Sequence, residues 1–269
     1  MFLPDNIDLA QSEKYCLSIR LTPNGFSFLI FLYADKSIFY FNEIAFSKNL
    51  SAIENLKKIF FEANLFAHQY KSITVNIVSP RYTVVPNSLF EKGNVIDYFN
   101  FNIHGDTGKV LSSYVEQGDY NIVWDMSEEK YSFLFRSLWN AQFTNFTTHL
   151  LSFYHNHGNE NKKRCFIDFD INMVTISCFE DEQLRSVNTF VSNSKYDTIY
   201  YIVNIWDKHP LDQNNDFLYI SGDIKNNWET IDILKKLIRN VHEIHLPLPI
   251  KVRDYKKNIP TDLLIQLCE

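Results

Sequence analysis

The chain has 269 residues, of which 45% are apolar, and it contains 23 Phe, 15 Tyr and 4 Trp but only 7 Gly and 8 Pro. This length fits one large domain or two small ones, and the apolar share supports packed cores, so a disordered or collagen-like chain is excluded. With 26 Lys and Arg against 32 Asp and Glu, the formal net charge of -6 gives no general attraction for nucleic acid or an anionic membrane.

The first half of the chain opens with three consecutive strand-like segments. Each is rich in β-branched and aromatic residues and ends at a short polar turn, and together they cover residues 15–21, 26–33 and 37–46. Ser51 and Glu54 have the spacing of a capping box, which predicts a helix running to about residue 70. Residues 72–78 then form a continuous apolar run of the kind found inside a sheet.

The middle of the chain has a weaker pattern. Prolines bracket an extended segment at residues 80–86, and Ser88 predicts the start of a short helix. Two strands, a helix and a stretch ambiguous between helix and strand follow, in that order, at residues 109–114, 120–124, 127–139 and 143–154. The polar, aperiodic segment 155–164 is the predicted junction between two lobes, which we place at residues 1–155 and 156–269.

The second half of the chain repeats the order of the first. Its three opening strands are predicted at residues 165–170, 173–179 and 183–191, and a helix, a strand, a helix and a short strand follow at 195–206, 217–221, 227–241 and near 244. Short stretches of similar sequence begin at Cys16 and at Cys165, which gives a repeat of about 149 residues. Each copy is large enough for its own core, so a duplicated α/β unit is predicted rather than a solenoid. The tail, residues 260–267, is a short amphipathic helix expected to pack on the protein itself.

Polar residues gather at the ends of the predicted strands of the second half. Around the first turn lie Asp168, Asp170, Asn172 and Thr175, and the fourth strand closes on Ser221, Gly222 and Asp223. With the order of elements, these residues resemble a ribonuclease-H-like unit, and two such units in tandem resemble the superfamily of sugar kinases, heat-shock chaperones and actin. The chain is similar to actin-like proteins of bacterial cell division and of pilus or secretion assembly. It resembles most an uncharacterised Bacteroidetes family with an actin-like ATPase fold and no assigned function.

The resemblance implies an α/β fold of two tandem ribonuclease-H-like units, each with three antiparallel strands followed by a helix and a parallel strand, forming a two-lobed actin-like ATPase fold. It also implies a place for ATP with Mg²⁺. In working members a strand-turn-strand rich in Asp grips phosphate, and a loop after a later strand contacts adenosine. The candidate cofactor-binding residues at the matching positions are Asn24, Gly25, Asp170, Asn172, Thr175, Ser221, Gly222 and Asp223.

This chain departs from the pattern of that superfamily. The turn of the first half, residues 18–25, contains no acid, and Arg20 cannot hold Mg²⁺. No glycine lies between Lys162 and Ser221, which hinders a close approach of the backbone to phosphate. The loop after the fourth strand keeps one glycine, where two or more are usual in the family. We therefore expect degenerate nucleotide-binding motifs and assign no catalytic residue.

Asp168, Asp170 and Asp223 support a second interpretation, a metal-dependent nuclease. The first and fourth strands of a ribonuclease-H-like unit are neighbours, so the three carboxylates could converge on one or two metal ions. The competing interpretation is that Asp168 and Asp170 are turn-side residues and that Asp223 starts a turn or caps the next helix. No basic, aromatic-lined surface is evident in the sequence, so a nucleic-acid partner is not expected.

Other motifs are weaker. Gly108 and Lys109 lack the flanking residues of a phosphate-binding Walker loop, and His242 and His245 are one residue short of the H-E-x-x-H spacing. The four cysteines show no C-x-x-C spacing and are expected to be free structural thiols. The longest apolar stretch, residues 26–34, is about half a membrane span and no signal segment begins the chain, so we expect a cytoplasmic protein without membrane insertion.

The function expected from these observations is a non-catalytic binding or scaffold protein that has a protein partner and no cofactor. An ATP-binding actin-like ATPase and a metal-dependent nuclease stay open as alternatives. The three differ in whether Mg²⁺ and ATP stabilise the folded protein and in whether any bond is cleaved.

Overall fold

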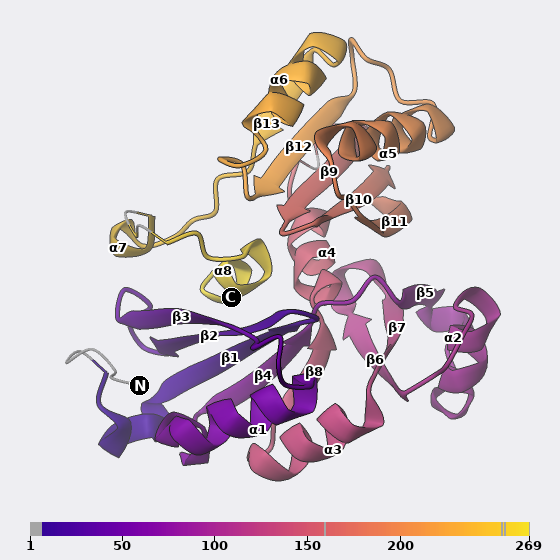
Figure 1. Cartoon of the computed structure of the whole chain (residues 1–269). Coiled ribbons are helices and arrows are strands. Elements are labelled where there is room, and N and C mark those ends of the chain that lie inside the picture. Colours follow the sequence, from indigo (N-terminus) through magenta and orange to yellow (C-terminus); the bar gives the residue numbers. More distant parts are fainter. Residues whose placement is uncertain (1–6, 159, 254, 256, 269) are drawn as a thin grey trace. The chain divides into compact units, whose positions relative to one another are not determined.

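The computed structural model divides the chain into two compact units (Figure 1). It describes every residue except 1–6, 159, 254, 256 and 269. Unit 1 consists of Met1–Val115, Asp119–Thr148 and Leu248–Tyr255, and unit 2 consists of Glu116–Gly118, His149–Pro247 and Lys256–Glu269. The main passage from unit 1 to unit 2 therefore falls within helix α4 (Thr147–His155).

The main sheet of unit 1 has five strands in the order β3-β2-β1-β4-β8. Their bounds are β1 Tyr15–Thr22, β2 Gly25–Leu32, β3 Phe39–Ala45, β4 Ser72–Ile77 and β8 Gln142–Asn145. The first three pair antiparallel, whereas β4 is parallel to β1 and to β8. Helices α1 (Ala52–Glu62) and α3 (Glu128–Ser137) lie along one face, where the rings of Phe60 and Phe133 are 5.2 Å apart (Figure 1). The predicted opening strands and the buried fourth strand are confirmed.

Helix α1 begins at the predicted capping box. The backbone N–H of Glu54 donates to Ser51 Oγ at 3.3 Å, and the backbone N–H of Ser51 donates to Glu54 Oε2 at 2.7 Å. The helix ends earlier than predicted and is followed by a 3₁₀ turn, η2 (Asn64–Ala67). The ring of Phe66 in this turn packs edge to face on Phe26 of β2 at 5.5 Å. A tertiary contact has thus overridden the helical periodicity read from the sequence.

A three-stranded sheet in the order β5-β7-β6 is inserted between β4 and α3. Its elements are β5 Tyr82–Pro86, α2 Val95–Asn102, β6 Lys109–Val115 and β7 Tyr120–Met126. The helix predicted from Ser88 is wrong in position, because the chain there forms a 3₁₀ turn and α2 begins only at Val95. Its apolar face, centred on Phe99, packs against Val85 and Val123 and fixes that start.

Residues 143–154, ambiguous in the sequence, form a strand and a helix. Strand β8 ends at Asn145, whose Oδ1 accepts hydrogen bonds from the backbone N–H (3.1 Å) and the hydroxyl (2.6 Å) of Thr147, the first residue of α4. This buried cap turns the chain from strand to helix without a glycine. Once α3 and β8 are counted after the insertion, unit 1 has the same order of elements as unit 2.

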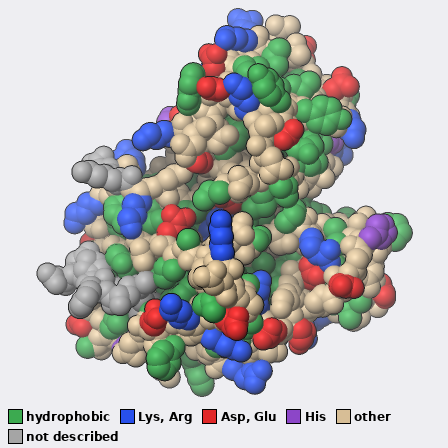
Figure 2. All heavy atoms as spheres, in the orientation of Figure 1, with side chains coloured by type: hydrophobic (Ala, Val, Ile, Leu, Met, Phe, Trp, Pro, Cys, Tyr) green, Lys and Arg blue, Asp and Glu red, His purple; other side chains and the backbone are tan. Residues whose placement is uncertain are grey.

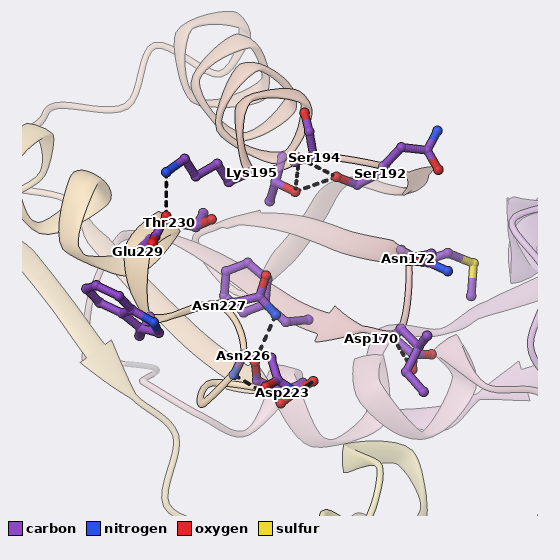
Figure 3. Close-up of a pocket in the computed structure, with 16 residues that line it drawn as sticks. Asp170, Asn172, Ser192, Ser194, Lys195, Asp223, Asn226, Asn227, Glu229 and Thr230 are labelled. Carbon is purple, nitrogen blue, oxygen red and sulfur yellow. Dashed lines mark hydrogen bonds and ion pairs between the residues drawn. The ribbon is translucent and has the colours of Figure 1, made fainter.

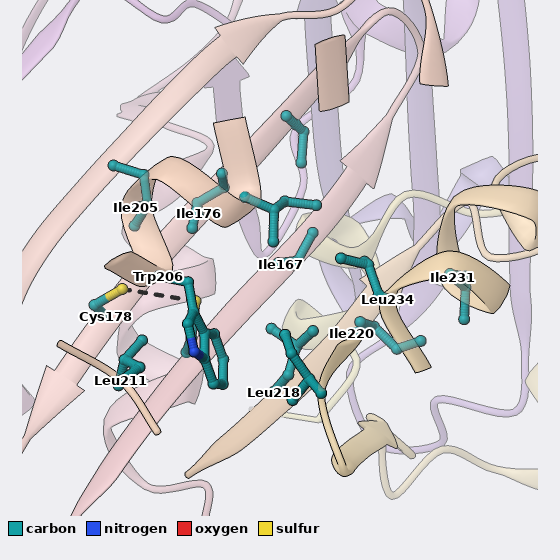
Figure 4. Packing of buried hydrophobic residues seen from close by; sticks show 14 of the residues in the cluster. Ile167, Ile176, Cys178, Ile205, Trp206, Leu211, Leu218, Ile220, Ile231 and Leu234 are labelled. Carbon is teal, nitrogen blue, oxygen red and sulfur yellow. Dashed lines mark hydrogen bonds between the residues drawn. The ribbon is translucent and has the colours of Figure 1, made fainter. Parts of the chain in front are cut away.

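The sheet of unit 2 has the order β11-β10-β9-β12-β13. Its strands are β9 Lys163–Asp170, β10 Met173–Glu180, β11 Gln183–Val191, β12 Phe217–Gly222 and β13 Asn240–Glu243. Helices α5 (Lys195–Lys208) and α6 (Trp228–Leu237) cover one face and enclose the apolar core in Figure 4. The helix predicted over 227–241 ends sooner, because Asn240 already pairs with β12. The tail forms α8 (Thr261–Gln266), which belongs to unit 2 and is largely buried.

The tight turns give the register of the repeat. Thr22 is the last paired residue of β1 and Asp170 is the last of β9, so the offset from Thr22 to Asp170 is 148 residues. Arg20 of β1 therefore corresponds to Asp168 of β9, and both side chains are buried. The offset of about 149 taken from the cysteines is one residue too long. A slip of one residue exchanges the two faces of a strand, so the cysteine match was wrong in register.

The surface seen in Figure 2 carries Lys and Arg side chains interspersed with Asp and Glu on the visible face of each unit, not gathered by sign. That face therefore offers no broad basic area for nucleic acid. Among the helices of the described residues, none combines the length and the apolar character that crossing a bilayer requires.

Candidate functional site

A polar pocket of about 520 Å³ lies at the edge of the unit 2 sheet where β9 and β12 end (Figure 3). Three segments surround it: the β9–β10 turn, the junction of β11 with α5, and the loop from β12 to α6. Its lining residues are 169–173, 192–195, 198, 223 and 226–230. Ligands of open α/β sheets bind outside the carboxyl ends of the strands, which makes this pocket the candidate site.

Side-chain interactions hold the first turns of α5 and α6 at the pocket. Ser194 caps α5, and its Oγ accepts a backbone hydrogen bond of 3.2 Å from the first turn. The side chain of Asn227, just before α6, donates to the carbonyl oxygen of Asp223 at 2.8 Å. An ion pair between Lys195 and Glu229 joins the two helices, and this carboxylate raises the pKa of the Lys195 ammonium. The sequence analysis did not identify Lys195 or Glu229 as site residues. Ser194, which precedes the predicted helix 195–206, is the one signal that could have indicated the junction of β11 with α5.

Three of the predicted cofactor-binding residues line the pocket: Asp170, Asn172 and Asp223. Asp170 Oδ1 accepts the backbone N–H of the next residue at 2.7 Å, and Asn172 has a φ of 58°, in the left-handed region that asparagine tolerates. Asp223 accepts a hydrogen bond of 2.7 Å from the side chain of Asn226. Both carboxylates therefore stabilise turns while their side chains contribute to the wall of the pocket.

Thr175 and Ser221, also predicted to bind cofactor, do not line the pocket. Thr175 lies opposite Asp168 across the β9–β10 pair, and its hydroxyl oxygen is 2.9 Å from that of Thr189. Ser221 lies beside Asp168 in the β9–β12 register, and both are buried. The pairing places these side chains on the face of the sheet opposite the core under α5 and α6, because side chains alternate along a strand. Asn24 belongs to the β1–β2 turn of unit 1 and is likewise outside this pocket.

The two glycines among the predicted residues have different reasons to be glycine. Gly222 has a φ of +86°, and a Cβ on it would lie 2.1 Å from the carbonyl oxygen of Phe169. The pairing of β12 with β9 therefore explains why this residue is glycine, and no bound ligand is needed as the reason. Gly25 in unit 1 is less restricted, since a Cβ there would meet the carbonyl oxygen of Ile44 at 3.3 Å.

Asp168 is the hub of a buried polar network. Its Oδ1 accepts a hydrogen bond of 2.7 Å from Ser221 Oγ, which also lies 2.9 Å from the hydroxyl of Tyr154 on α4. Desolvation raises the pKa of the Asp168 carboxyl to about 7, although hydrogen bonds from Thr261 and Ser221 act in the opposite direction. Burial of the same kind raises the pKa of Tyr154. The network therefore joins the sheet to α4 and α8.

The three carboxylates predicted to bind metal are divided between two environments. Asp168 lies in the buried network, whereas Asp170 and Asp223 line the pocket. Among the described residues, no group of three His, Cys, Asp or Glu side chains is arranged so that it could hold a metal ion. The geometry therefore gives the nuclease hypothesis no support.

The charge of the pocket is acidic. Asp170, Asp223 and Glu229 contribute three carboxylates to the lining, against the single ammonium of Lys195. That ammonium is already paired with Glu229. A phosphate ester that entered alone would be repelled by the excess negative charge. Its binding would therefore be weakened unless a cation accompanied it.

A second pocket, of about 350 Å³, occupies the corresponding place in unit 1, at the ends of β1 and β4 and the start of α3. Its lining residues are 21–23, 77–81, 125–127 and 130. Arg81 and Asp125 meet there in a two-pronged ion pair, with Nε–Oδ1 and Nη2–Oδ2 distances of 3.0 and 3.1 Å. Neither residue was a sequence candidate, because a contact between residues 44 positions apart leaves no local pattern.

Two units with the same order of strands and helices, and a pocket at the same sheet edge of each, define an actin-like two-lobed ATPase fold. The chain belongs to the DUF3822 family, whose description is "Protein of unknown function" and whose sequence profile matches residues 4–241. The resemblance stated from the sequence is thereby confirmed at the level of family and fold.

Solved structures agree with this assignment. A protein from Bacteroides thetaiotaomicron VPI-5482, described as having an actin-like ATPase fold and unknown function, is 26% identical, with 98% of this chain and 99% of that chain covered at a TM-score of 0.84. A chain of the PilM-PilN type IV pilus biogenesis complex is 9% identical over 86% of this chain and 88% of that one, with a TM-score of 0.52, which shows the fold alone. None of the curated proteins compared with this chain matches it.

Proposed function

We propose that this protein is a non-catalytic binding protein with an actin-like fold, in which the nucleotide site has lost the residues needed for catalysis. The observation that carries the proposal is the way in which the fold itself uses the residues of the adenosine motif. Ser221 donates to Asp168, and Gly222 is required by the backbone of Phe169. Neither is left to serve a nucleotide.

The first unit supports the same conclusion. In the position equivalent to Asp168 it has Arg20, and its β1–β2 turn, closed by Thr22 and Gly25, contains no carboxylate. A Mg²⁺ ion that bridges nucleotide phosphates needs oxygen ligands such as carboxylates. Asp170 and Asp223, the predicted acids that line the unit 2 pocket, have no counterpart in the turn of unit 1, which makes a weak basis for phosphoryl transfer.

Exposed aromatic side chains on the two helices that begin at the unit 2 pocket support a protein as the partner. Tyr196 and Tyr200 on α5 and Trp228 on α6 are 69%, 65% and 63% exposed. Tyrosine and tryptophan are enriched in the energetic centres of protein interfaces, since they bury large areas at low entropic cost. The proposed scaffold function would use this surface.

A second candidate function, binding of a nucleoside without hydrolysis, is favoured by one observation. The unit 2 pocket has the volume of a small-molecule site, and the exposed indole of Trp228 forms part of its wall. An indole ring can stack on a purine, and the side chains of Asn226 and Asn227 offer hydrogen bonds to its edge.

Thermal unfolding with increasing ATP, with and without Mg²⁺, tests the first proposal. We expect no shift of the unfolding temperature at millimolar ATP and no release of phosphate. A stabilisation that grows with Mg-ATP concentration and is lost in Asp170→Asn would overturn it, because a ligand that binds only the folded state must raise stability with concentration.

Titration with adenosine tests the second candidate. If a nucleoside binds, Trp228→Ala should abolish the shift, whereas Trp139→Ala, which removes a similarly exposed tryptophan (70%) from unit 1, should leave it unchanged. Absence of any shift in the unaltered protein rejects nucleoside binding and leaves the first proposal intact.

A further inference from the structure

The pocket of unit 1 differs in chemistry from its counterpart in unit 2. Its walls are largely apolar and include Leu21, Pro23, Ile77, Val78, Pro80 and Met126. Its volume of about 350 Å³ lies near the lower end of the range for small-molecule sites. Such walls favour a ligand with a short hydrocarbon portion.

The ion pair in this pocket is internally neutral. The guanidinium of Arg81 is held by both oxygens of Asp125 and also donates to the backbone oxygens of His104 (3.3 Å) and Asp106 (2.9 Å). Asp125 Oδ2 in addition accepts the backbone N–H of Gly108 at 3.2 Å. Arg81 and Asp125 therefore compensate each other and leave little capacity for a ligand.

Lys130, in the first turn of α3, is the remaining charged residue of the lining. Its ammonium has no hydrogen-bond or ion-pair partner within the described residues, and desolvation lowers its pKa. A half-buried cation without a partner is unfavourable, so an anion at the same place would gain free energy by pairing with it. The lining thus has one uncompensated positive charge, whereas the equivalent pocket of unit 2 has an excess of negative charge.

We propose that the unit 1 pocket binds a small aliphatic carboxylate, with its carboxylate on the Lys130 ammonium and its chain against the apolar wall formed by residues such as Ile77 and Met126. The single positive charge of Lys130 is neutralised by one monoanion. The resulting ion pair has no net charge, which suits a partly desolvated site. A phosphate dianion would leave a charge unpaired. This site is independent of the nucleotide site of unit 2 and of its loss of function.

Calorimetric titration of the full-length protein with sodium hexanoate tests the proposal, with hexan-1-ol and inorganic phosphate as separate probes. We expect saturable binding of hexanoate and no saturable binding of the alcohol or of phosphate. Lys130→Met should weaken hexanoate binding at least about tenfold, the loss expected for a charge-assisted hydrogen bond. Lys130→Arg should retain most of it. Lys48→Met, which removes an exposed lysine of the same unit outside the pocket, is the matched control and should bind normally.

A second measurement covers the case in which Lys130→Met unfolds the protein. After reductive ¹³C-methylation of the lysines, NMR should show the pKa of Lys130 rising when hexanoate is added, while the methyl signal of Lys48 should not respond to hexanoate. The proposal is overturned if hexanoate does not bind, if the folded Lys130→Met variant binds as well as the unaltered protein, or if the pKa of Lys130 does not move. Binding of phosphate with equal affinity would overturn the choice of a carboxylate.

Discussion

Asp168 on β9 and Ser221 on β12 lie side by side in a parallel register, and their side chains are joined by a hydrogen bond of 2.7 Å in the interior of unit 2. Asp168 was predicted to bind a metal and Ser221 to bind a nucleotide, but their side chains are hydrogen-bonded to each other. The bond belongs to a network with Tyr154 and Thr261, which makes it a structural element between the sheet and two helices.

Asp168→Asn should change the pH dependence of stability. The folded carboxyl has a pKa of about 7, against 3.8 for the unperturbed group. Between these values the unfolded state loses its proton while the folded state keeps it, so the contribution of Asp168 to stability is complete below about pH 4 and is lost as the pH rises through 7. Asparagine mimics the protonated acid, so the variant should be more stable at pH 8, by at most about 4 kcal/mol.

The measurement is urea unfolding of both proteins from pH 4 to 8, read as the difference between them. His155, whose pKa burial lowers to about 4, titrates with the opposite sign but is present in both proteins and cancels. A difference that stays constant over this range would contradict the raised pKa of Asp168.

Gly222→Ala should destabilise the protein by more than about 3 kcal/mol, since the residue needs a positive φ and its Cβ would collide with the backbone of Phe169. Gly93→Ala is the matched control. No atom lies within 4 Å of a Cβ built there, so its effect on the free energy of unfolding should be within about 0.5 kcal/mol. Equal effects of the two substitutions in chemical unfolding would show that Gly222 is not restricted by the fold.

Arg81 and Asp125 should be energetically coupled. In a double-mutant cycle of Arg81→Met and Asp125→Asn, we expect a coupling free energy of about 1–3 kcal/mol, because the Asp125 carboxylate is only 8% exposed and the geometry is two-pronged. The exposed pair Lys57 and Glu129, at 3.9 Å in the same unit, should give less than about 0.5 kcal/mol. Similar values for both cycles would argue against a special role of the Arg81–Asp125 pair.

The cysteines should differ in reactivity. The Sγ atoms of Cys165 and Cys178 are 3.6 Å apart in the core, and the hydrogen bond from Cys178 together with burial raises the pKa of Cys165, whereas Cys268 is partly exposed. Reaction with a thiol reagent under native conditions should therefore modify one cysteine quickly, and Cys268→Ser should remove that phase. Fast modification of Cys165 in the folded protein would contradict its burial.

Local sequence patterns predicted much of the architecture. Runs of β-branched and aromatic residues located the three opening strands of each five-stranded sheet, and the capping box at Ser51 located the start of α1, because these signals depend on neighbours a few residues apart. The same signals failed where long-range packing decided, as at the early end of α1 beside Phe66 and the late start of α2 around Phe99.

The candidate site shows the same division. The sequence by itself determined the order of elements, the duplication and the absence of an acid in the turn before Gly25. Only the tertiary structure decided that Asp170 and Asp223 line a pocket while Ser221 bonds to Asp168. It also decided that Lys130 has no partner among the described residues, in the pocket that holds the pair of Arg81 and Asp125. The physical reason is that the face on which a strand residue lies depends on the register with other strands, and charge compensation depends on residues far apart in the chain.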